Sequence, residues 1–549
     1  MDMDETKICV GIDLGTTNTS AAYSRLGLDG QVILSDLEIR QKGRGAQRTY
    51  GVLPSIMYRK SSGEEVVGSE AQDLKNSSIV SADEEVRYLE NTKRYIGTRK
   101  AFQIDEEIYT PIEVATLILS HVKNYSLIKK MTDDYITIIT VPANFNNDQR
   151  NDTLEAAHRA GFRNVELYDE PKAAILSFLH DESQKREGKL LDVSTRKRIL
   201  VIDIGGGTCD ISVEDVEARD GQYVFSHLAV GRKDLGGVDF DKRVGDELAK
   251  KELRGISLSP AEIASIRDIG QRAKESLSDN IDEFIWDNCD GDNSKLYEDP
   301  GWLDILDGED YEFSLSREIR GQTVNFSMTV REFVNAINPL IYKMDDSIAA
   351  NKDEREHTKN METLIDTTLS DYDIDIDSID VIFLTGGMAK CFPLRAALFE
   401  LYGKKVISPS KPFLAVSRGA ALVNKYKSID ESSKDLMPNA VMMEMSDGRL
   451  RTLVKMGEQV PVTNTVPDTF KTVSRNGVVI RLFEGKNEFD SQLRRINNLY
   501  VIKFTEPQNS GREFEIRYSV DRTKRIRFTI IFLDTGEEYS IDGQIREGK

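Results

Sequence analysis

Three apolar runs along the chain end in the same way, each passing from a strand of buried type into a glycine turn. They span residues 10–18 (VGIDLGTTN), 201–210 (VIDIGGGTCD) and 381–388 (VIFLTGGM). Short apolar runs that end at glycine predict strands that are buried on both faces. After the third turn, Pro393 and the apolar residues that follow it at helical spacing predict a helix.

Strand-like runs alternate with helical patterns over most of the chain, which predicts an α/β domain over residues 1–427. One helix start is well marked, because Ser259 and Glu262 form a candidate capping box around Pro260. A polar stretch then follows this domain. We interpret residues 428–437 as an interdomain linker.

Beyond the linker the hydrophobic period changes to two. Apolar and polar side chains alternate in residues 478–482, 514–518 and 526–532, and the last run ends at an Asp534-Thr535-Gly536 turn. This alternation predicts antiparallel strands with one buried face over residues 438–549. The fold class is therefore α/β followed by a small antiparallel β domain, for which the strand pattern favours a β-sandwich.

The turns after the first two runs have the chemistry of a polyphosphate site. Glycine lets backbone N–H groups approach phosphate oxygens and threonine adds hydroxyl donors, while Asp13 and Asp203 stand where a carboxylate holds a hydrated magnesium ion. A single turn of this kind is equally well explained as an ordinary hairpin turn. Two copies behind matching strands favour a clamp that closes on one nucleotide from both sides. The Gly386-Gly387 turn fits an adenosine that lies against backbone.

Five further motifs occur along the chain in a fixed order. They are residues 93–97 (KRYIG), 141–150 (VPANFNNDQR), 169–174 (DEPKAA), 235–241 (LGGVDFD) and 416–421 (VSRGAA). Together with the glycine turns, these motifs resemble the heat-shock protein 70 family, within the actin, hexokinase and chaperone ATPase superfamily. The resemblance covers residues 7–425. It implies an actin-like, two-lobed, duplicated ATPase domain that binds ATP or ADP with Mg²⁺. For the second domain it implies a β-sandwich that binds extended apolar peptides.

The resemblance also implies a role for each matching residue. Asp13 and Asp203 would orient the hydrated magnesium, and Glu170 with Asp210 would position the water that attacks the γ-phosphate. The catalytic set is then Asp203, Glu170, Asp210 and the residue at position 72, which is Gln72. The nucleotide would be held by Gly15, Thr16, Thr17, Asn18, Gly205, Gly206, Gly207, Thr208, Gly236, Gly237, Lys274, Ser278, Gly386 and Gly387.

The chain departs from the family pattern around the nucleotide. Gln72 stands where the family has a catalytic lysine, and Lys75 lies one helical turn later. Gln271 and Glu275 replace an acid and an adenine-stacking arginine. A glutamine carries no charge against the charge that develops in the transition state, and losing one such group slows chemistry about 100-fold or more. We therefore expect slow ATP hydrolysis and modest nucleotide affinity.

Two features near the C-terminal strands also differ from the family. The predicted strands end close to Lys549, so we expect no helical lid over a bound peptide. The linker lacks the leucine-rich run that docks on the ATPase domain in the family, and Leu436-Met437 is one of its few apolar candidates. Peptide release is then limited by groove contacts alone, so long-lived capture of a client is not expected.

Composition narrows the range of partners. The chain has 73 Lys plus Arg against 93 Asp plus Glu, and the resulting net charge of −20 argues against nucleic acid as a partner. Residues 279–312 hold thirteen of these acids, a single base and both tryptophans. We interpret this stretch either as a solvated insertion or as a docking surface for a basic partner.

The remaining residue chemistry argues against several other classes. Four cysteines without CxxC spacing and five scattered histidines predict reduced structural thiols and no zinc site. The N-terminus is acidic where a secretion signal would be basic, and no apolar stretch approaches the ~20 residues of a membrane span. We therefore expect a cytoplasmic protein that does not bind membranes.

Two functions remain open. The first is a chaperone-like ATP-binding protein that hydrolyses slowly and binds a polypeptide client through its β domain, together with a co-chaperone or nucleotide-exchange partner. The second is a nucleotide-sensing scaffold with little or no ATPase activity that recruits one dedicated protein partner. Sugar and glycerol kinases share the phosphate turns but would lack the motifs at 141–150 and 235–241, and the β domain argues against an actin-like filament.

Overall fold

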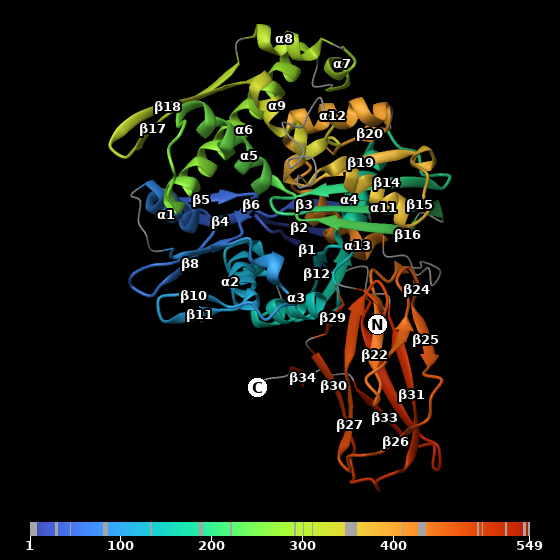
Figure 1. Ribbon diagram of the computed structural model, residues 1–549. Coiled ribbons are helices and arrows are strands. Elements are labelled where there is room, and N and C mark those ends of the chain that lie inside the picture. Colours follow the sequence, from blue (N-terminus) through green and yellow to red (C-terminus); the bar gives the residue numbers. More distant parts are fainter. Residues whose placement is uncertain are drawn as a thin grey trace.

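The computed structural model of the chain is shown in Figure 1. It describes residues 8–27, 31–43, 46–80, 86–131, 134–185, 190–219, 222–289, 293–299, 301–309, 311–345, 359–409, 411–426, 435–490, 493–496, 498–521, 524–541 and 545–546. Of the linker expected over residues 428–437, residues 428–434 lie outside the described residues.

The first apolar run lies in the middle of a six-stranded sheet. β1 (Ile8–Leu14) pairs antiparallel with β2 (Asn18–Leu26) and parallel with β12 (Tyr135–Val141). The sheet is completed by β13 (Val165–Asp169), β3 (Val32–Asp36) and β6 (Val52–Pro54). β12 is buried along its whole length, as expected of a strand that has parallel neighbours and is covered on both faces.

The second sheet repeats this arrangement. β14 (Lys197–Ile204) pairs antiparallel with β15 (Cys209–Arg219) and parallel with β19 (Val381–Thr385). The edges of the sheet are β16 (Gln222–Lys233) and β20 (Val406–Ile407). Each of the strands β1 and β14 therefore has a hairpin partner on one side and a parallel strand on the other. The second and third apolar runs of the sequence lie next to each other, as β14 and β19.

The other helices and smaller strands of the α/β part lie around these two sheets, and the hairpin of β17 (Glu312–Ile319) and β18 (Gln322–Thr329) projects away from them (Figure 1). Those that belong to the first 184 residues are β4 (Ile39–Gly43), β5 (Ala46–Tyr50), β7 (Ile56–Arg59), β8 (Glu65–Val67), α1 (Ser69–Val80), β9 (Tyr88–Glu90), η1 (Thr92–Tyr95), β10 (Phe102–Ile104), β11 (Glu107–Tyr109), α2 (Pro111–Asn124), η2 (Leu127–Lys130), α3 (Asn147–Arg159) and α4 (Glu170–Gln184). Those that follow β16 are α5 (Gly237–Glu252), α6 (Pro260–Asn288), α7 (Asn293–Tyr297), α8 (Trp302–Gly308), β17 (Glu312–Ile319), β18 (Gln322–Thr329), α9 (Val330–Ile341), α11 (Met361–Asp371), η3 (Ile376–Ser378), η4 (Gly387–Lys390), α12 (Phe392–Tyr402), η5 (Gly403–Lys405) and α13 (Ala415–Tyr426).

Two helices predicted from the sequence are confirmed. The Ser259 side chain accepts a hydrogen bond from the Glu262 N–H, and the Glu262 carboxylate accepts one from the Ser259 N–H, so the capping box opens α6. Pro393 lies in the first turn of α12. Within the described part of the chain, no helix combines the length and the apolar character needed to cross a membrane.

α4 and α13 pack against each other between the two sheets. A Cβ atom on Gly419 would lie 1.7 Å from the Ala173 carbonyl oxygen, so the two helix backbones are almost in contact. α13 approaches β1 in the same way, since a Cβ atom on Gly11 would lie 2.2 Å from the Ala421 amide nitrogen. One hydrophobic cluster therefore runs from β12 of the first sheet, through both helices, to β14 and β19 of the second.

The acidic stretch over residues 279–312 runs from the second half of α6 through α7 and α8. Its two tryptophans lie in different surroundings. Trp302 packs edge-on against Phe392, with ring centroids 5.4 Å apart, whereas 75% of Trp286 is exposed. One tryptophan therefore ties the stretch to α12, and the other is left on the surface.

From Asp435 onward the described elements are strands, and their pairings are all antiparallel. They are β21 (Asp435–Leu436), β22 (Ala440–Glu444), β23 (Leu450–Val454), β24 (Gln459–Val460), β25 (Val462–Thr465), β26 (Phe470–Lys471), β27 (Gly477–Ile480), β28 (Leu482–Gly485), β29 (Arg494–Arg495), β30 (Asn498–Lys503), β31 (Glu513–Val520), β32 (Ile526–Phe532), β33 (Glu538–Ile541) and β34 (Ile545–Arg546). The sheets share one hydrophobic cluster.

The alternation predicted for residues 514–518 and 526–532 is confirmed in β31 and β32, where every second side chain is buried. The run over 478–482 differs from a single strand. Ile480 pairs with Tyr500 in β30, whereas the Arg481 carbonyl oxygen accepts a hydrogen bond from the Glu444 N–H and leads into β28 of another sheet. The alternation of buried and exposed side chains continues through Arg481. The chain moves into another sheet there, but the same side of the strand still faces the hydrophobic core.

Buried ion pairs join the C-terminal strands to the α/β part. Lys524 Nζ lies 3.1 Å from Asp169 Oδ2, and Arg150 donates a 2.8 Å hydrogen bond to the other oxygen of Asp169. Lys172 pairs with Asp435 of β21. Burial alone would raise the pKa of Asp169, but attraction to Lys524 and Arg150 holds it well below its ordinary range. Asp169 is therefore charged in the folded protein and anchors the C-terminal strands.

Replacing Lys524 with methionine should loosen this junction. Breaking a buried ion pair from one side typically costs about 3 kcal/mol or more, although Arg150 still faces Asp169. We expect the denaturant midpoint of the C-terminal transition to fall for Lys524→Met. Lys471→Met, which removes an exposed ion pair with Glu513, should change stability by less than about 1 kcal/mol. An unchanged midpoint for Lys524→Met would contradict the role given to the buried pair.

Candidate active site

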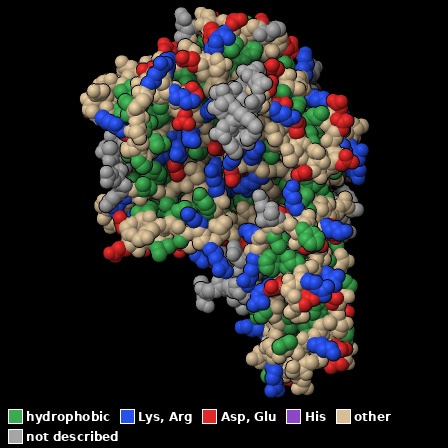
Figure 2. Space-filling view, in the orientation of Figure 1, with side chains coloured by type: hydrophobic (Ala, Val, Ile, Leu, Met, Phe, Trp, Pro, Cys, Tyr) green, Lys and Arg blue, Asp and Glu red, His purple; other side chains and the backbone are tan. Residues whose placement is uncertain are grey.

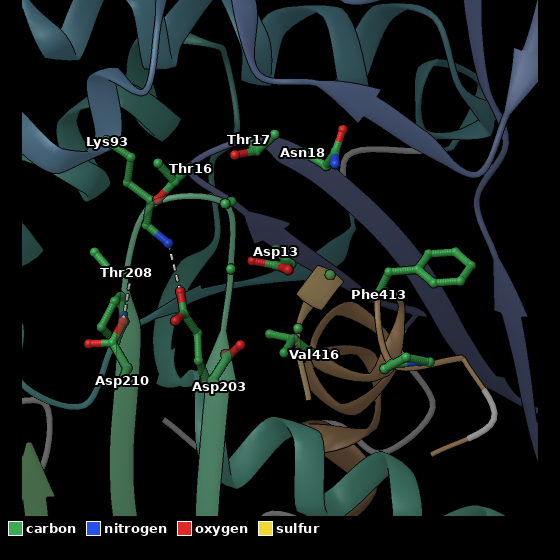
Figure 3. Close-up of a pocket in the computed structure, with 18 of the residues that line it drawn as sticks. Asp13, Thr16, Thr17, Asn18, Lys93, Asp203, Thr208, Asp210, Phe413 and Val416 are labelled. Atoms are coloured by element: carbon green, nitrogen blue, oxygen red, sulfur yellow. Dashed lines mark hydrogen bonds and ion pairs between the residues drawn. The ribbon is translucent and has the colours of Figure 1, made fainter. Parts of the chain in front are cut away.

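The turns after β1 and β14 face each other across one cavity, which we call the central cavity (Figure 3). It lies where the two sheets meet, and its lining comes from segments far apart in the sequence, from Asp13 to Val416. Its lining consists of Asp13, Gly15, Thr16, Thr17, Asn18, Lys93, Pro142, Phe145, Glu170, Asp203, Gly205, Gly206, Thr208, Asp210, Arg232, Gly386, Gly387, Pro412, Phe413 and Val416.

The two turns come so close that a side chain would keep them apart. A Cβ atom on Gly206 would lie 1.6 Å from Thr17 Oγ1, so the second turn needs glycine where it faces the first. The second turn is also held from behind by α5. The N–H groups of Gly237 and Val238 donate to the carbonyl oxygens of Gly205 and Gly206, at 3.0 and 2.8 Å.

The third turn approaches the end of β14. Gly386 has φ +85°, a conformation that favours glycine, and a Cβ atom there would lie 2.5 Å from Asp203 Oδ1. The three glycine turns predicted from the sequence therefore border the same cavity.

Four carboxylates line the central cavity. Burial raises the pKa of Asp13, and it raises the pKa of Asp203 well above its ordinary value, with repulsion from Glu170 adding to the effect. Burial also raises the pKa of Glu170 to about 7. Asp210 accepts a 2.9 Å hydrogen bond from Thr208 Oγ1. Because these carboxylates are costly to ionise side by side, the cavity favours a positively charged ligand.

Asp13 and Asp203 fit a magnesium ion that is held mainly by water and phosphate. Magnesium usually keeps several waters and is bound through one or two carboxylates together with substrate phosphates. The side chains of the protein suit this kind of binding. The described residues contain no group of three or more His, Cys, Asp or Glu side chains placed to hold a metal ion by themselves. A divalent cation would add positive charge beside this buried pair.

Lys93 also lines the central cavity, and no role was assigned to it from the sequence. It belongs to η1, and its Nζ donates a 2.7 Å hydrogen bond to Glu170 Oε1. Both side chains are nearly buried, at 11% and 8% exposure. Burial alone would lower the pKa of Lys93, but attraction to Glu170 and Asp13 raises it above its ordinary value. Its only signal in the sequence was its place in the motif at 93–97, which lies 77 residues before Glu170.

A second cavity, of about 370 Å³, adjoins the central one, and we call it the adjoining cavity. Its volume is in the range of small-molecule pockets. Lys274 Nζ lies 2.6 Å from Asp241 Oδ1 at its wall. Three residues predicted to contact the nucleotide line the adjoining cavity but not the central one, namely Gly237, Lys274 and Ser278. The two cavities share Thr17, Asn18, Gly205, Gly206 and Gly387.

Gln72 lines the adjoining cavity and is absent from the lining of the central one. Its amide donates a 3.1 Å hydrogen bond to Asn76. Lys75, one helical turn after Gln72, lies in the same cavity and pairs with Glu90 at 2.7 Å. The structure therefore places both residues beside the carboxylate cluster rather than within it.

The other residues that the sequence analysis singled out lie in the lining of the adjoining cavity or next to the second glycine turn. Gln271 donates a 2.9 Å hydrogen bond to Glu275, and both line the adjoining cavity. Gly207 and Gly236 line neither cavity. A Cβ atom on Gly236 would lie 2.6 Å from the Gly207 amide nitrogen, so Gly236 lets α5 approach the second turn, whereas a Cβ atom on Gly207 would lie 2.4 Å from Arg94 Nε.

Comparison with known proteins gives consistent matches over most of the chain. A family model described as "Hsp70 protein" matches residues 9–286 and 355–541. The chaperone protein DnaK of Thermosipho melanesiensis is 27% identical over 550 residues, covering 97% of this chain and 79% of that protein. The DnaK proteins of Thermosipho africanus and Thermotoga maritima are each 26% identical, covering 97% and 98% of this chain and 79% and 80% of their own.

Replacing Gly206 with alanine tests the geometry of the facing turns. The added methyl would overlap Thr17 Oγ1, so the turns must separate. We expect Gly206→Ala to weaken Mg-ADP binding at least about tenfold, equivalent to about 1.4 kcal/mol, in calorimetry. Gly308→Ala, where a Cβ atom meets nothing within 4 Å, should bind as the wild type does. Equal affinity in all three proteins would contradict the clamp.

Proposed function

The chain belongs to the Hsp70 protein family, and we propose that it is a chaperone-like protein that binds ATP with Mg²⁺, hydrolyses it slowly and binds polypeptide. One observation carries this proposal. Two glycine-threonine turns meet at a cavity that also holds four carboxylates and a buried lysine. Backbone N–H groups and hydroxyls suit phosphate oxygens, and carboxylates suit magnesium and an attacking water.

The domain assignment follows from the two sheets and the C-terminal strands. We assign residues 1–427 to an actin-like, two-lobed nucleotide-binding domain, 428–437 to the linker and 438–549 to a β-sandwich. The matching neighbours of β1 and β14 support a duplicated domain. The antiparallel sheets around one hydrophobic cluster support a sandwich.

Each carboxylate of the central cavity has a separate role in this proposal. Asp13 and Asp203 would hold the hydrated magnesium, which neutralises phosphate charge when it is bound. Glu170 would accept a proton from the attacking water, and its pKa, which burial raises to about 7, suits a general base near neutral pH. Asp210, fixed by its hydrogen bond from Thr208, would orient that water.

The adjoining cavity would take the nucleoside. Lys274 and Ser278 line it, Gly387 lines both cavities, and Gly386 lines the central one. Glu275 offers a carboxylate where a guanidinium would stack on adenine, so part of the stacking energy is lost. Modest affinity for ATP and ADP follows.

The partners proposed are a polypeptide client and a co-chaperone or nucleotide-exchange protein. The relatives named as chaperone proteins support this class of partner. All four cysteines are buried and unbridged, which suits a reducing compartment, so we place the protein in the cytoplasm. Neither nucleic acid nor a membrane is proposed as a partner.

A nucleotide-sensing scaffold is the second candidate. The observation that favours it is the exposed Trp286 on an acidic helix, because a large aromatic residue on the surface is a common anchor of protein interfaces. In that case ATP would be bound with little hydrolysis, and the acidic stretch over 279–312 would recruit one basic partner.

The magnesium assignment can be tested by calorimetry with and without the metal. Asp13→Asn removes a charge that faces the cation, so Mg-ATP should bind at least about tenfold more weakly, whereas ATP with a chelator should bind as it does to the wild type. Asp380→Asn, an exposed change outside the site, is the matched control. Equal weakening with and without metal would show that Asp13 does not act through magnesium.

Fluorescence anisotropy on the full chain separates the two candidate functions. A labelled extended apolar peptide should bind with a Kd of about 1 μM or weaker and dissociate fast, and ATP should change its affinity. A peptide of the same length with charged residues in place of the apolar ones should bind more weakly. Absence of peptide binding with ATP, with ADP and without nucleotide would favour the scaffold.

A further inference from the structure

The described lining of the central cavity has two positively charged side chains, Lys93 and Arg232. The Lys93 ammonium is engaged by Glu170, to which it donates a 2.7 Å hydrogen bond. Arg232 comes from β16 and lies nearer the surface, with 23% of its side chain exposed. The roles proposed for the carboxylates and for the magnesium leave this arginine without a function.

Arg232 lies beside Asp210 without a hydrogen bond to it. The two residues pair across β15 and β16, and Arg232 Nε is 3.8 Å from Asp210 Oδ1, which is too far for a hydrogen bond. Both oxygens of Asp210 already accept hydrogen bonds, from Thr208 Oγ1 at 2.9 Å and from Asn144 Nδ2 at 3.3 Å. The guanidinium therefore keeps donors that this carboxylate does not take.

An aromatic ring supports the guanidinium at the junction of the two sheets. The central carbon of the Arg232 guanidinium lies 5.7 Å from the centroid of the Phe145 ring, which is a cation–π contact. Phe145 is buried in the hydrophobic core of the first sheet, whereas Arg232 belongs to the second. The contact therefore spans the junction and keeps a planar guanidinium in the wall of the central cavity.

The place of Arg232 matches the end of the cavity at which hydrolysis leaves its phosphate product. In the proposed reaction the water oxygen bonds to the γ-phosphorus, and the bond from that phosphorus to the bridging oxygen breaks. The electron pair goes to ADP, and the water proton goes to Glu170. The phosphorus thereby moves toward the side of the attacking water, where Asp210 lies. Figure 3 shows Asp210 on the opposite side of the cavity from Phe413.

An anion at this end of the cavity needs a cation from the protein. Glu170 and Asp210 would repel a phosphate ion, whereas an arginine offers it two parallel N–H donors and a full positive charge. We propose that Arg232 binds the inorganic phosphate that ATP hydrolysis releases and holds it in the central cavity after its bond to ADP has broken. This inference rests on the proposed function and adds a product site to it. The complex with ADP and phosphate then lasts longer than it would without the arginine.

The test is calorimetry in which sodium phosphate is titrated into the full chain saturated with Mg-ADP. Arg232→Gln should bind phosphate at least about tenfold more weakly than the wild type, because hydrogen bonds to a charged group are lost. Arg232→Lys, which keeps the charge without the planar fork, should lie between them. Mg-ADP itself should bind both variants within about threefold of the wild type, because ADP lacks the group that Arg232 contacts.

Two further variants serve as controls. Arg219→Gln, which removes an exposed ion pair with Glu217 outside the cavity, should bind phosphate as the wild type does. Arg232→Ala is a second truncation, and either truncation that still binds Mg-ADP is sufficient for the comparison. Loss of Mg-ADP binding in both truncations would overturn a role confined to the product.

A second arm separates released phosphate from the γ-phosphoryl group of bound ATP, which has the same chemistry. The non-hydrolysable β,γ-imido analogue of ATP, with Mg²⁺, should bind Arg232→Gln within about threefold of the wild type. The reason is that its terminal phosphate is still attached and has not moved toward Asp210. A loss for the analogue as large as the loss for free phosphate would overturn the assignment to the released product.

The remaining outcomes separate this inference from the function on which it rests. Equal phosphate affinity in the wild type and in a truncation that binds Mg-ADP would overturn the role of Arg232 alone. A wild-type complex with Mg-ADP that binds no phosphate would do the same and leave the nucleotide site standing. A wild type that binds no nucleotide would overturn the nucleotide site and this inference together.

Discussion

The crowding of carboxylates at the junction of the two sheets is the constraint on which the rest of the structure depends. Asp13, Glu170 and Asp203 come from three different elements, and burial raises the pKa of each. Folding brings them together although their mutual repulsion opposes it, which is common where a site is organised for binding a cation. The turns, the lysine and the close helix packing can all be understood as means of holding this cluster in place around a charged ligand.

Many strands and turns of the α/β part could be predicted from the sequence, because they depend on the types of neighbouring residues. The apolar runs at 10–18, 201–210 and 381–388 became β1, β14 and β19 with their glycine turns, because buried strands need continuous apolar residues and close turns need glycine. The capping box at Ser259 was equally local. Most of the nucleotide-site residues inferred from the family resemblance lie around the two cavities, since the motifs that carry the resemblance form their walls.

What the sequence did not reveal depends on contacts between distant segments. Lys93 lies in one turn of 3-10 helix without a hydrophobic period, and its 2.7 Å contact with Glu170 joins residues 77 positions apart in the sequence. The change of sheet at Arg481 leaves the alternation intact, so the pattern of residues 478–482 reads the same for one strand or two. Lys524 looks like a solvated residue in a basic run, yet it is buried because Asp169 lies opposite it.

The backbone contacts of α13 also limit how the two sheets can move. Gly419 meets Ala173 of α4, and Gly11 of β1 meets Ala421 of α13, without room for a methyl group in either contact. Sliding of packed helices needs side chains that can shift between neighbouring grooves, and none intervene at these two points. The two sheets can therefore rotate about these contacts, but the helices cannot slide along each other there. Opening of the central cavity is then a rotation about α13, in which the glycine turns separate most and the helix contact least.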